Sequence, residues 1–185
     1  LIVTKYNFDG HHRRLFDVDE TIRSYRSDYE NAASVVRCGQ DIHEMEMPRL
    51  YKSCNCFVLP SRGEGFGLPY VEAGLCGLPV IATKHSGHTM FLNEDNSYLL
   101  DIDRLSAVPA GYTNVHFWDN EIFPELSDDK TVESLGKLMR RAFENRAEAQ
   151  AKTAKLQKDL NLFTLDVVGS LAKARLEEIC KMLNN

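Results

Sequence analysis

The stretch from Cys56 to Gly77 constrains the fold more than any other part of the sequence. It opens with an apolar run of strand-like length and composition, which Pro60 ends. Glycines at positions 63, 65 and 67 then leave the backbone open to close approach by a ligand. Pro69 suits the first turn of a helix, and Gly77 marks its end. The sequence therefore predicts a strand, a glycine-rich loop and a helix whose N-terminal N–H groups form an anion site.

Two carboxylates frame this loop. Glu64 lies within it, and Glu72 lies one turn into the predicted helix. Because a helical side chain leans toward the helix N-terminus, we expect Glu72 to lean toward the loop that carries Glu64. A phosphate alone does not require two acidic neighbours. A ligand that combines phosphate with a polyhydroxyl group does, since amides hold the phosphates and carboxylates hold the sugar hydroxyls.

These residues resemble the signature of retaining glycosyltransferases with the GT-B fold. Glu64 and Glu72 form E-x7-E, and segments 60–61, 64–69 and 72–73 have the sequences PS, EGFGLP and EA. Within that fold the chain is most similar to the large family 4 group, which includes sucrose-phosphate synthases and mannosyltransferases. The similarity extends from about residue 2 to residue 178.

The resemblance implies transfer of a hexose from a nucleotide-diphosphate sugar to an acceptor hydroxyl, with the anomeric configuration retained. It assigns Glu64, the catalytic candidate, to the hydroxyls of the donor sugar, and Glu72 to the ribose hydroxyls of the nucleotide. It also assigns to the donor the backbone N–H groups of Gly65, Phe66, Gly67 and Leu68. No cofactor and no metal are expected, since the nucleotide sugar is the substrate.

Two further donor-binding candidates, Arg62 and Ile42, carry weaker signals. Arg62 is the only cation beside the loop, and it either contacts phosphate or is a solvated surface residue. Ile42 belongs to the segment from Gln40 onward that, in similar proteins, meets the nucleotide base. Those contacts use the main chain and leave little trace in side chains, so the base stays open.

Each site assignment has a structural alternative. Glu64 is otherwise an exposed turn carboxylate, and Glu72 a carboxylate that complements the helix dipole. The Phe66 ring is packed if only its backbone serves the donor. His85 and His88 flank Ser86–Gly87, and we interpret them as ordinary loop histidines, with a catalytic base as the alternative.

Position 90 and two acidic triplets depart from the expected pattern. The family usually has an acidic residue where this chain has Met90, which puts the contact made by that acid in doubt. Residues 17–19 and 101–103 both match D-x-D, the metal–nucleotide motif of the other major glycosyltransferase fold. Neither triplet follows the strand that this motif needs, so we predict no metal site.

Composition restricts the partners of the chain. Its 185 residues suffice for one domain, and a net charge of −5 without a basic run argues against nucleic-acid binding. No apolar stretch is long enough to span a membrane. The five cysteines lie mostly within apolar elements, which indicates reduced thiols in a cytoplasmic protein. Membrane association through a missing N-terminal part stays open.

The pattern along the chain predicts an α/β fold, a Rossmann-like doubly wound parallel sheet with C-terminal helices, equivalent to one half of a GT-B fold. Asp9–Gly10 is expected as a turn, 144–160 as an exposed helix and 129–185 as a helical tail of the same domain. We expect strands at 1–4, 34–38, 56–59, 80–83 and 98–100, with an edge strand at 115–118. We expect the other helices at 11–32, 48–53, 69–76, 132–143 and 168–183.

The chain begins abruptly with a strand and resembles a fragment of a longer protein. By resemblance, it lacks the N-terminal acceptor domain and the first strand of the donor domain, whose following loop carries an Arg and a Lys for the diphosphate. The fragment alone is expected to be inactive, and the acceptor (a glycan, a lipid or a small molecule) to bind the missing domain. One alternative is a non-catalytic nucleotide-sugar-binding or assembly module. The other is an epimerase or phosphorylase of the GT-B type.

Overall fold

The computed structural model describes residues 2–3, 9–10, 13–14, 17–38, 42–108 and 120–183. The strands are β1 (Ile2–Val3), β2 (Asp9–Gly10), β3 (Arg13–Arg14), β4 (Val36–Arg37), β5 (Phe57–Leu59), β6 (Val80–Thr83), β7 (Tyr98–Leu100), β8 (Leu105–Ala107) and β9 (Ile122–Pro124). The α-helices are α1 (Val18–Ser27), α2 (Met47–Lys52), α3 (Leu68–Leu75), α4 (Asp129–Glu144), α5 (Arg146–Leu160) and α6 (Leu165–Leu183). Short 3-10 helices are η1 (Glu44–Glu46), η2 (Gly87–Met90) and η4 (Asn161–Phe163).

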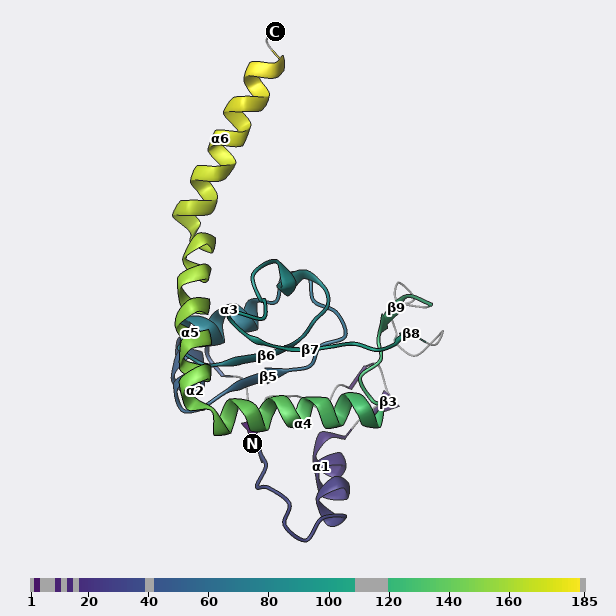
Figure 1. The fold of residues 1–185 in the computed structure, drawn as a ribbon. Coiled ribbons are helices and arrows are strands. Elements are labelled where there is room, and N and C mark those ends of the chain that lie inside the picture. Colours follow the sequence, from purple (N-terminus) through teal and green to yellow (C-terminus); the bar gives the residue numbers. More distant parts are fainter. Residues whose placement is uncertain are drawn as a thin grey trace.

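The core is built on a parallel sheet of β5, β6 and β7, with β6 in the middle. Every residue of β6 is buried, because helices cover both faces of the sheet (Figure 1). On one face Val80 and Ala82 pack with α3 and α5. On the other face Ile81 packs with α4. Such two-sided burial is typical of parallel sheets in α/β proteins and confirms the predicted fold class.

The remaining strands form smaller sheets. β1 and β4 pair in parallel, and β8 and β9 form an antiparallel pair that was not predicted. We expected one sheet, but across the described ranges no strand pairing joins β1–β4 to β5–β6–β7. β1 and β4 contribute only two residues each, and these residues pair only with one another. The edge strand predicted at 115–118 lies outside the described residues.

The turn predicted at Asp9–Gly10 was wrong, and the helix predicted over residues 11–32 is shorter than expected. Asp9–Gly10 is a strand that pairs with Arg13–Arg14. The helix therefore starts later, at Val18, where the Asp17 carboxylate accepts the N–H groups of residues 19 and 20 as an N-cap.

Helix α3 follows the predicted pattern closely. It starts one residue before Pro69 and ends in a Schellman motif, in which Gly77 has φ +86°. The N–H of Leu78 donates to the Ala73 carbonyl, and the N–H of Gly77 donates to the Gly74 carbonyl. Gly74 also lets α5 approach, since a Cβ there would lie 2.8 Å from Leu156.

Helix α5 was predicted to be exposed, which was wrong. Its residues at positions 149, 153, 156 and 160 are buried, and Leu156 and Leu160 belong to the core cluster that contains Tyr70. These positions follow the i, i+4, i+7, i+11 spacing of one helix face. The many charged residues between them hid that stripe from the sequence reasoning.

The apolar residues of α4 lie on two faces. Leu135, Leu138 and Ala142 pack against the sheet with Ile81. Val132 and Phe143 remain exposed on the outer face. The N-cap of this helix is Asp128, which accepts the Thr131 N–H at 3.0 Å. The helix starts at Asp129, where the helical tail was expected to begin.

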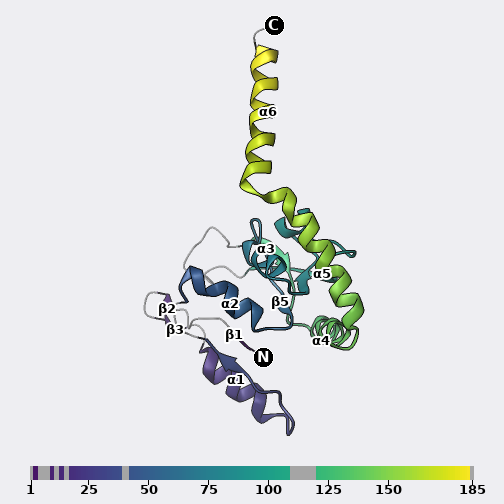
Figure 2. The same ribbon diagram turned by 90° about the vertical axis from the view of Figure 1, so that its left-hand side faces the viewer.

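Helix α6 projects away from the rest of the molecule in both views (Figures 1 and 2). None of its residues is buried, although its sequence carries the predicted apolar stripe. In the ranges that the structure covers, no helix has both the length and the apolar content needed to cross a bilayer. All five cysteines are free thiols.

Candidate functional site

The site lies where β5 and β6 end. Parallel strands bring their carboxyl ends to one edge of the sheet, and ligands of such sheets bind there. The loop of residues 60–67, here called the glycine loop, follows β5. Residues 84–86 follow β6 and lead into η2. The two segments touch, because the Gly87 N–H donates to the Glu64 carbonyl at 3.2 Å.

Four consecutive N–H groups of the glycine loop and the α3 start lack a protein acceptor. The N–H of Gly63 donates to Ser61 Oγ, and the N–H of Glu64 donates to Ser86 Oγ. From Gly65 through Leu68, no acceptor is found among the described residues. Gly67, with φ +88°, is the N-cap of α3 and supplies no side-chain cap. These N–H groups and the positive end of the helix dipole are the features that an anion site uses.

The Glu64 carboxylate has no hydrogen bond or ion pair to the parts of the chain that the structure describes, and its side chain is half-buried. Burial, and then the negative charge of Glu64, raise the pKa of Tyr70. The Tyr70 hydroxyl therefore stays protonated and donates a hydrogen bond to the Leu59 carbonyl at 2.8 Å. Glu64 is thus a carboxylate available to a ligand beside the unpartnered N–H groups.

Glu72 has one partner, which sequence reasoning missed. The Tyr51 hydroxyl on α2 donates to Glu72 Oε2 at 3.0 Å. Burial of the phenol, and then this hydrogen bond, raise the pKa of Tyr51 well above its usual range. Tyr51 therefore remains a donor and holds one oxygen of an otherwise exposed carboxylate, leaving the other oxygen for a ligand. The only sequence signal was the short predicted helix that carries Tyr51.

Arg62 is half-buried and hydrogen-bonded, so it is not a solvated surface residue. Its Nε donates to the Pro124 carbonyl and one Nη donates to Ser106 Oγ, both at 2.9 Å. Ser106 in turn donates to Glu125, whose pKa is lowered to about 2 by hydrogen bonds from Ser127 and Ser106 and by the Arg62 charge. Arg62 thus ties the glycine loop to the β8–β9 pair.

His88 is a packed core residue rather than an exposed loop histidine, which corrects that interpretation. It is fully buried, and its Nε2 lies 2.6 Å from the Thr83 carbonyl oxygen. Its ring lies 4.5 Å from the ring of Tyr70. His88 Nδ1 and Thr83 Oγ1 are buried without a partner in the described ranges. His85 is half-buried.

The other candidate residues differ in packing and exposure. The Phe66 ring packs against Phe91 and Phe163, with ring centroids 5.1 and 5.6 Å away, which agrees with a structural role of the ring. Leu68 is exposed, and Ile42 is half-buried before η1. Gln40 lies outside the described residues. Met90 is 74% exposed and offers no charge at the position where the family has an acid.

Both D-x-D triplets have structural roles. Asp17 caps α1, and Asp19 pairs with Arg37 at 2.7 Å. Asp101 pairs with Lys84 at 3.3 Å, and Asp103 pairs with Lys130. These partners explain the acidic residues without a ligand.

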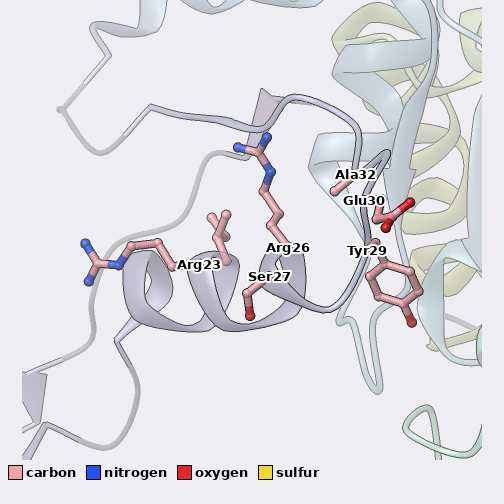
Figure 3. A pocket seen from close by; sticks show the side chains of 7 residues that line it. Arg23, Arg26, Ser27, Tyr29, Glu30 and Ala32 are labelled. Atoms are coloured by element: carbon pink, nitrogen blue, oxygen red, sulfur yellow. The ribbon is translucent and has the colours of Figure 1, made fainter.

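An open pocket of about 290 Å³ lies at α1, well apart in sequence from the glycine loop. It is lined by Ile22, Arg23, Arg26, Ser27, Tyr29, Glu30 and Ala32. The guanidinium groups of Arg23 and Arg26 point in different directions and do not converge on one position (Figure 3). The pocket therefore lacks the arrangement of an anion site, and the glycine loop remains the candidate.

The chain is similar to known glycosyltransferases. Residues 19–104 match the family model described as Glycosyl transferases group 1. Over 84 residues the chain is 34% identical to a D-inositol 3-phosphate glycosyltransferase of Streptomyces bingchenggensis, a match that covers 40% of this chain and 18% of that protein. The match to the family model contains the glycine loop and both glutamates.

Two solved structures share the fold over nearly the whole chain. Sucrose-phosphate synthase from Thermosynechococcus elongatus has a TM-score of 0.62 at 19% identity, covering 98% of this chain and 38% of that one. Anabaena Alr3699/HepE, solved with UDP and glucose, has a TM-score of 0.62 at 20% identity, covering 97% and 40%. The chain thus spans about two fifths of the length of these proteins, and its fold is that of a GT-B glycosyltransferase domain.

Proposed function

We propose that this chain, a GT-B glycosyltransferase domain, is the donor-binding part of a retaining enzyme that moves a hexose from a nucleotide-diphosphate sugar to an acceptor hydroxyl. The observation that carries the proposal is the run of unpartnered N–H groups from Gly65 to Leu68 beside the unpaired carboxylate of Glu64. Amides suit a diphosphate and a carboxylate suits sugar hydroxyls. One edge of the sheet thus offers both halves of a sugar nucleotide a matching partner.

In the proposed mechanism the chain acts mainly through electrostatics and positioning. The amides and the N-terminus of α3 stabilise the charge that grows on the leaving diphosphate. Glu64 orients the donor sugar, and Glu72, held by Tyr51, binds the ribose hydroxyls through its other oxygen. Arg62, fixed by its bonds to the β8–β9 pair, adds positive charge to the loop.

We infer a front-face displacement. The acceptor hydroxyl forms its bond to the anomeric carbon on the face from which the diphosphate departs, and its proton leaves with the departing phosphate oxygen. No carboxylate of the glycine loop other than Glu64 is available in the described chain, and Glu64 serves the sugar hydroxyls. The acceptor site is assigned to a further domain, because the solved relatives are more than twice as long as this chain.

The test uses the full-length protein with UDP-, GDP- and ADP-hexoses and an acceptor panel. UDP-glucose is the first donor to try, since Alr3699/HepE was solved with UDP and glucose. We expect nucleoside diphosphate release with a product of unchanged anomeric configuration, and a loss of about 100-fold or more in kcat for Glu64→Gln. Glu133→Gln, an exposed helix glutamate paired with Lys137, is the matched control.

Other outcomes separate the alternatives. An inverted product contradicts the retaining mechanism. Donor binding without turnover by the full-length protein favours a non-catalytic module. Release of a free epimerised sugar, or dependence on inorganic phosphate, favours an epimerase or a phosphorylase.

A further inference from the structure

The main chain of Glu64 is held by the side chain of a residue 22 positions later. Ser86 Oγ accepts the Glu64 N–H at 2.7 Å and donates its own proton to the Glu64 carbonyl at 2.8 Å. One hydroxyl thus satisfies both backbone groups of the candidate catalytic residue. The Gly87 N–H makes a second bond to the same carbonyl at 3.2 Å.

The contact requires an unusual backbone. Ser86 has φ +75° and ψ −166°, a conformation that side-chain-bearing residues rarely adopt. A Cβ at Gly87 would lie 1.8 Å from the Gly65 carbonyl oxygen, so the next residue along the chain must be glycine. Strained residues persist where surrounding contacts fix them, and they cluster at functional sites.

Residues that follow Ser86 hold this segment in place. Thr89 Oγ1 donates to the Ser86 carbonyl at 2.7 Å. His88, buried below, lies where a Cβ on Gly67 would meet it at 3.0 Å. The segment after β6 therefore contacts the glycine loop at three successive points, namely Glu64, Gly65 and Gly67.

We propose that Ser86 is a positioning residue for Glu64. Its hydroxyl fixes the Glu64 peptide, and this sets the direction of the Glu64 carboxylate. The inference rests on the proposed function of the glycine loop. Ser86 itself touches no reacting atom and acts only through Glu64.

Two variants separate the hydroxyl from the backbone strain. Ser86→Ala removes the hydroxyl and keeps the strain, whereas Ser86→Gly removes the hydroxyl and relieves the strain. Ser97→Ala is the matched control, because Ser97 Oγ also donates to a backbone carbonyl at 2.8 Å, that of Asn93, but at the amino end of β7. Each variant is made in the full-length protein and assayed with UDP-glucose or whichever donor of the panel supports transfer.

We expect both Ser86 variants to lower kcat by about 10- to 100-fold, because a misplaced catalytic group costs rate even when binding survives. KM is expected to stay within about threefold of the original protein, since Tyr51 holds Glu72 independently of Ser86. In hydrogen–deuterium exchange, the Glu64 amide should exchange about tenfold faster in both variants, because both remove its acceptor, Ser86 Oγ. Ser97→Ala should leave kcat, KM and this exchange unchanged.

Several results would overturn the proposal. Recovery of kcat in Ser86→Gly but not in Ser86→Ala would assign the effect to strain rather than to the hydroxyl. Unchanged exchange of the Glu64 amide would refute the contact while leaving the proposed function intact. Normal turnover of Glu64→Gln would remove the proposed role of Glu64, and the positioning role of Ser86 would fail with it even if exchange had risen.

Discussion

The sequence predicted both the glycine loop and helix α6, but the two regions differ in what holds them in place. The loop has few side chains to pack, yet the main chain of Glu64 is fixed by contacts with a distant segment. Helix α6 has an apolar stripe, yet Leu165 is 92% exposed and Leu183 is 80% exposed. The difference shows that order at the site comes from long-range contacts, whereas α6 is held within the described chain by its own helical hydrogen bonds.

The largest expected effect concerns the helix pair beneath the site. Leu156 is completely buried between α3 and α5. Leu156→Ala should therefore lower the free energy of unfolding by about 2–5 kcal/mol through lost transfer energy and a cavity. Leu171→Ala, on exposed α6, should change it by less than about 0.5 kcal/mol. Urea denaturation of both variants measures the contrast, and a large loss at Leu171 would show that α6 has a buried partner.

A second prediction compares two glycines. Gly87→Ala forces a Cβ against the Gly65 carbonyl oxygen and should cost about 1–3 kcal/mol of unfolding free energy, with loss of donor binding. Gly136→Ala, in the middle of α4 where an added Cβ would meet nothing within 4 Å, should stabilise by up to about 1 kcal/mol. Thermal melts and donor titrations of both proteins check this. Equal effects at the two positions would contradict the close approach of the two loops.

A third prediction concerns Tyr51. Tyr51→Phe removes the hydrogen bond to Glu72 and should weaken donor binding by about 1 kcal/mol, or roughly fivefold in Kd. Calorimetric titration of the full-length protein with the active nucleotide sugar measures it. Tyr25→Phe, at an exposed residue of α1, is the control. An unchanged Kd in Tyr51→Phe would indicate that Glu72 does not need this hydrogen bond in order to bind ribose.

The smallest expected effect is a pH dependence at the β8–β9 pair. The pKa of Glu125 falls from an ordinary 4.5 to about 2 in the folded protein. A lowered folded-state pKa stabilises above the unfolded pKa, and that stabilisation is lost as pH falls through the folded pKa. The stability difference between the original protein and Glu125→Gln should therefore be constant above about pH 5 and shrink between pH 4.5 and 2. A difference that does not change with pH would argue against ionised Glu125 as the acceptor.

The parts that were predictable from sequence are those fixed by local chemistry. Pro60 follows the end of β5, Pro69 lies in the first turn of α3, and Gly77 lies just after its end. The predicted limits of β6 and β7 also match the structure. Asp128 likewise marks the start of α4. In each case the residue that indicates an element lies within a few positions of the end of that element.

The parts that were missed depend on residues far apart in the chain. Tyr51 and Glu72 are 21 positions apart, and Arg62 reaches Pro124 across 62 positions. Ser86 belongs to no periodic pattern in the sequence, so its contact with Glu64 was not predictable. The buried face of α5 was missed for a different reason, since charged residues separate its contact positions and two of these positions are alanine and threonine.

Hydrogen–deuterium exchange of the full-length protein with and without UDP-glucose tests donor binding at the glycine loop most directly. We predict slower exchange for peptides spanning residues 63–70 and unchanged exchange for α6 and for the α1 pocket. This pattern would place the donor on the N–H groups between Gly65 and Leu68. Protection confined to the α1 pocket, or binding without protection of the glycine loop, would contradict the account.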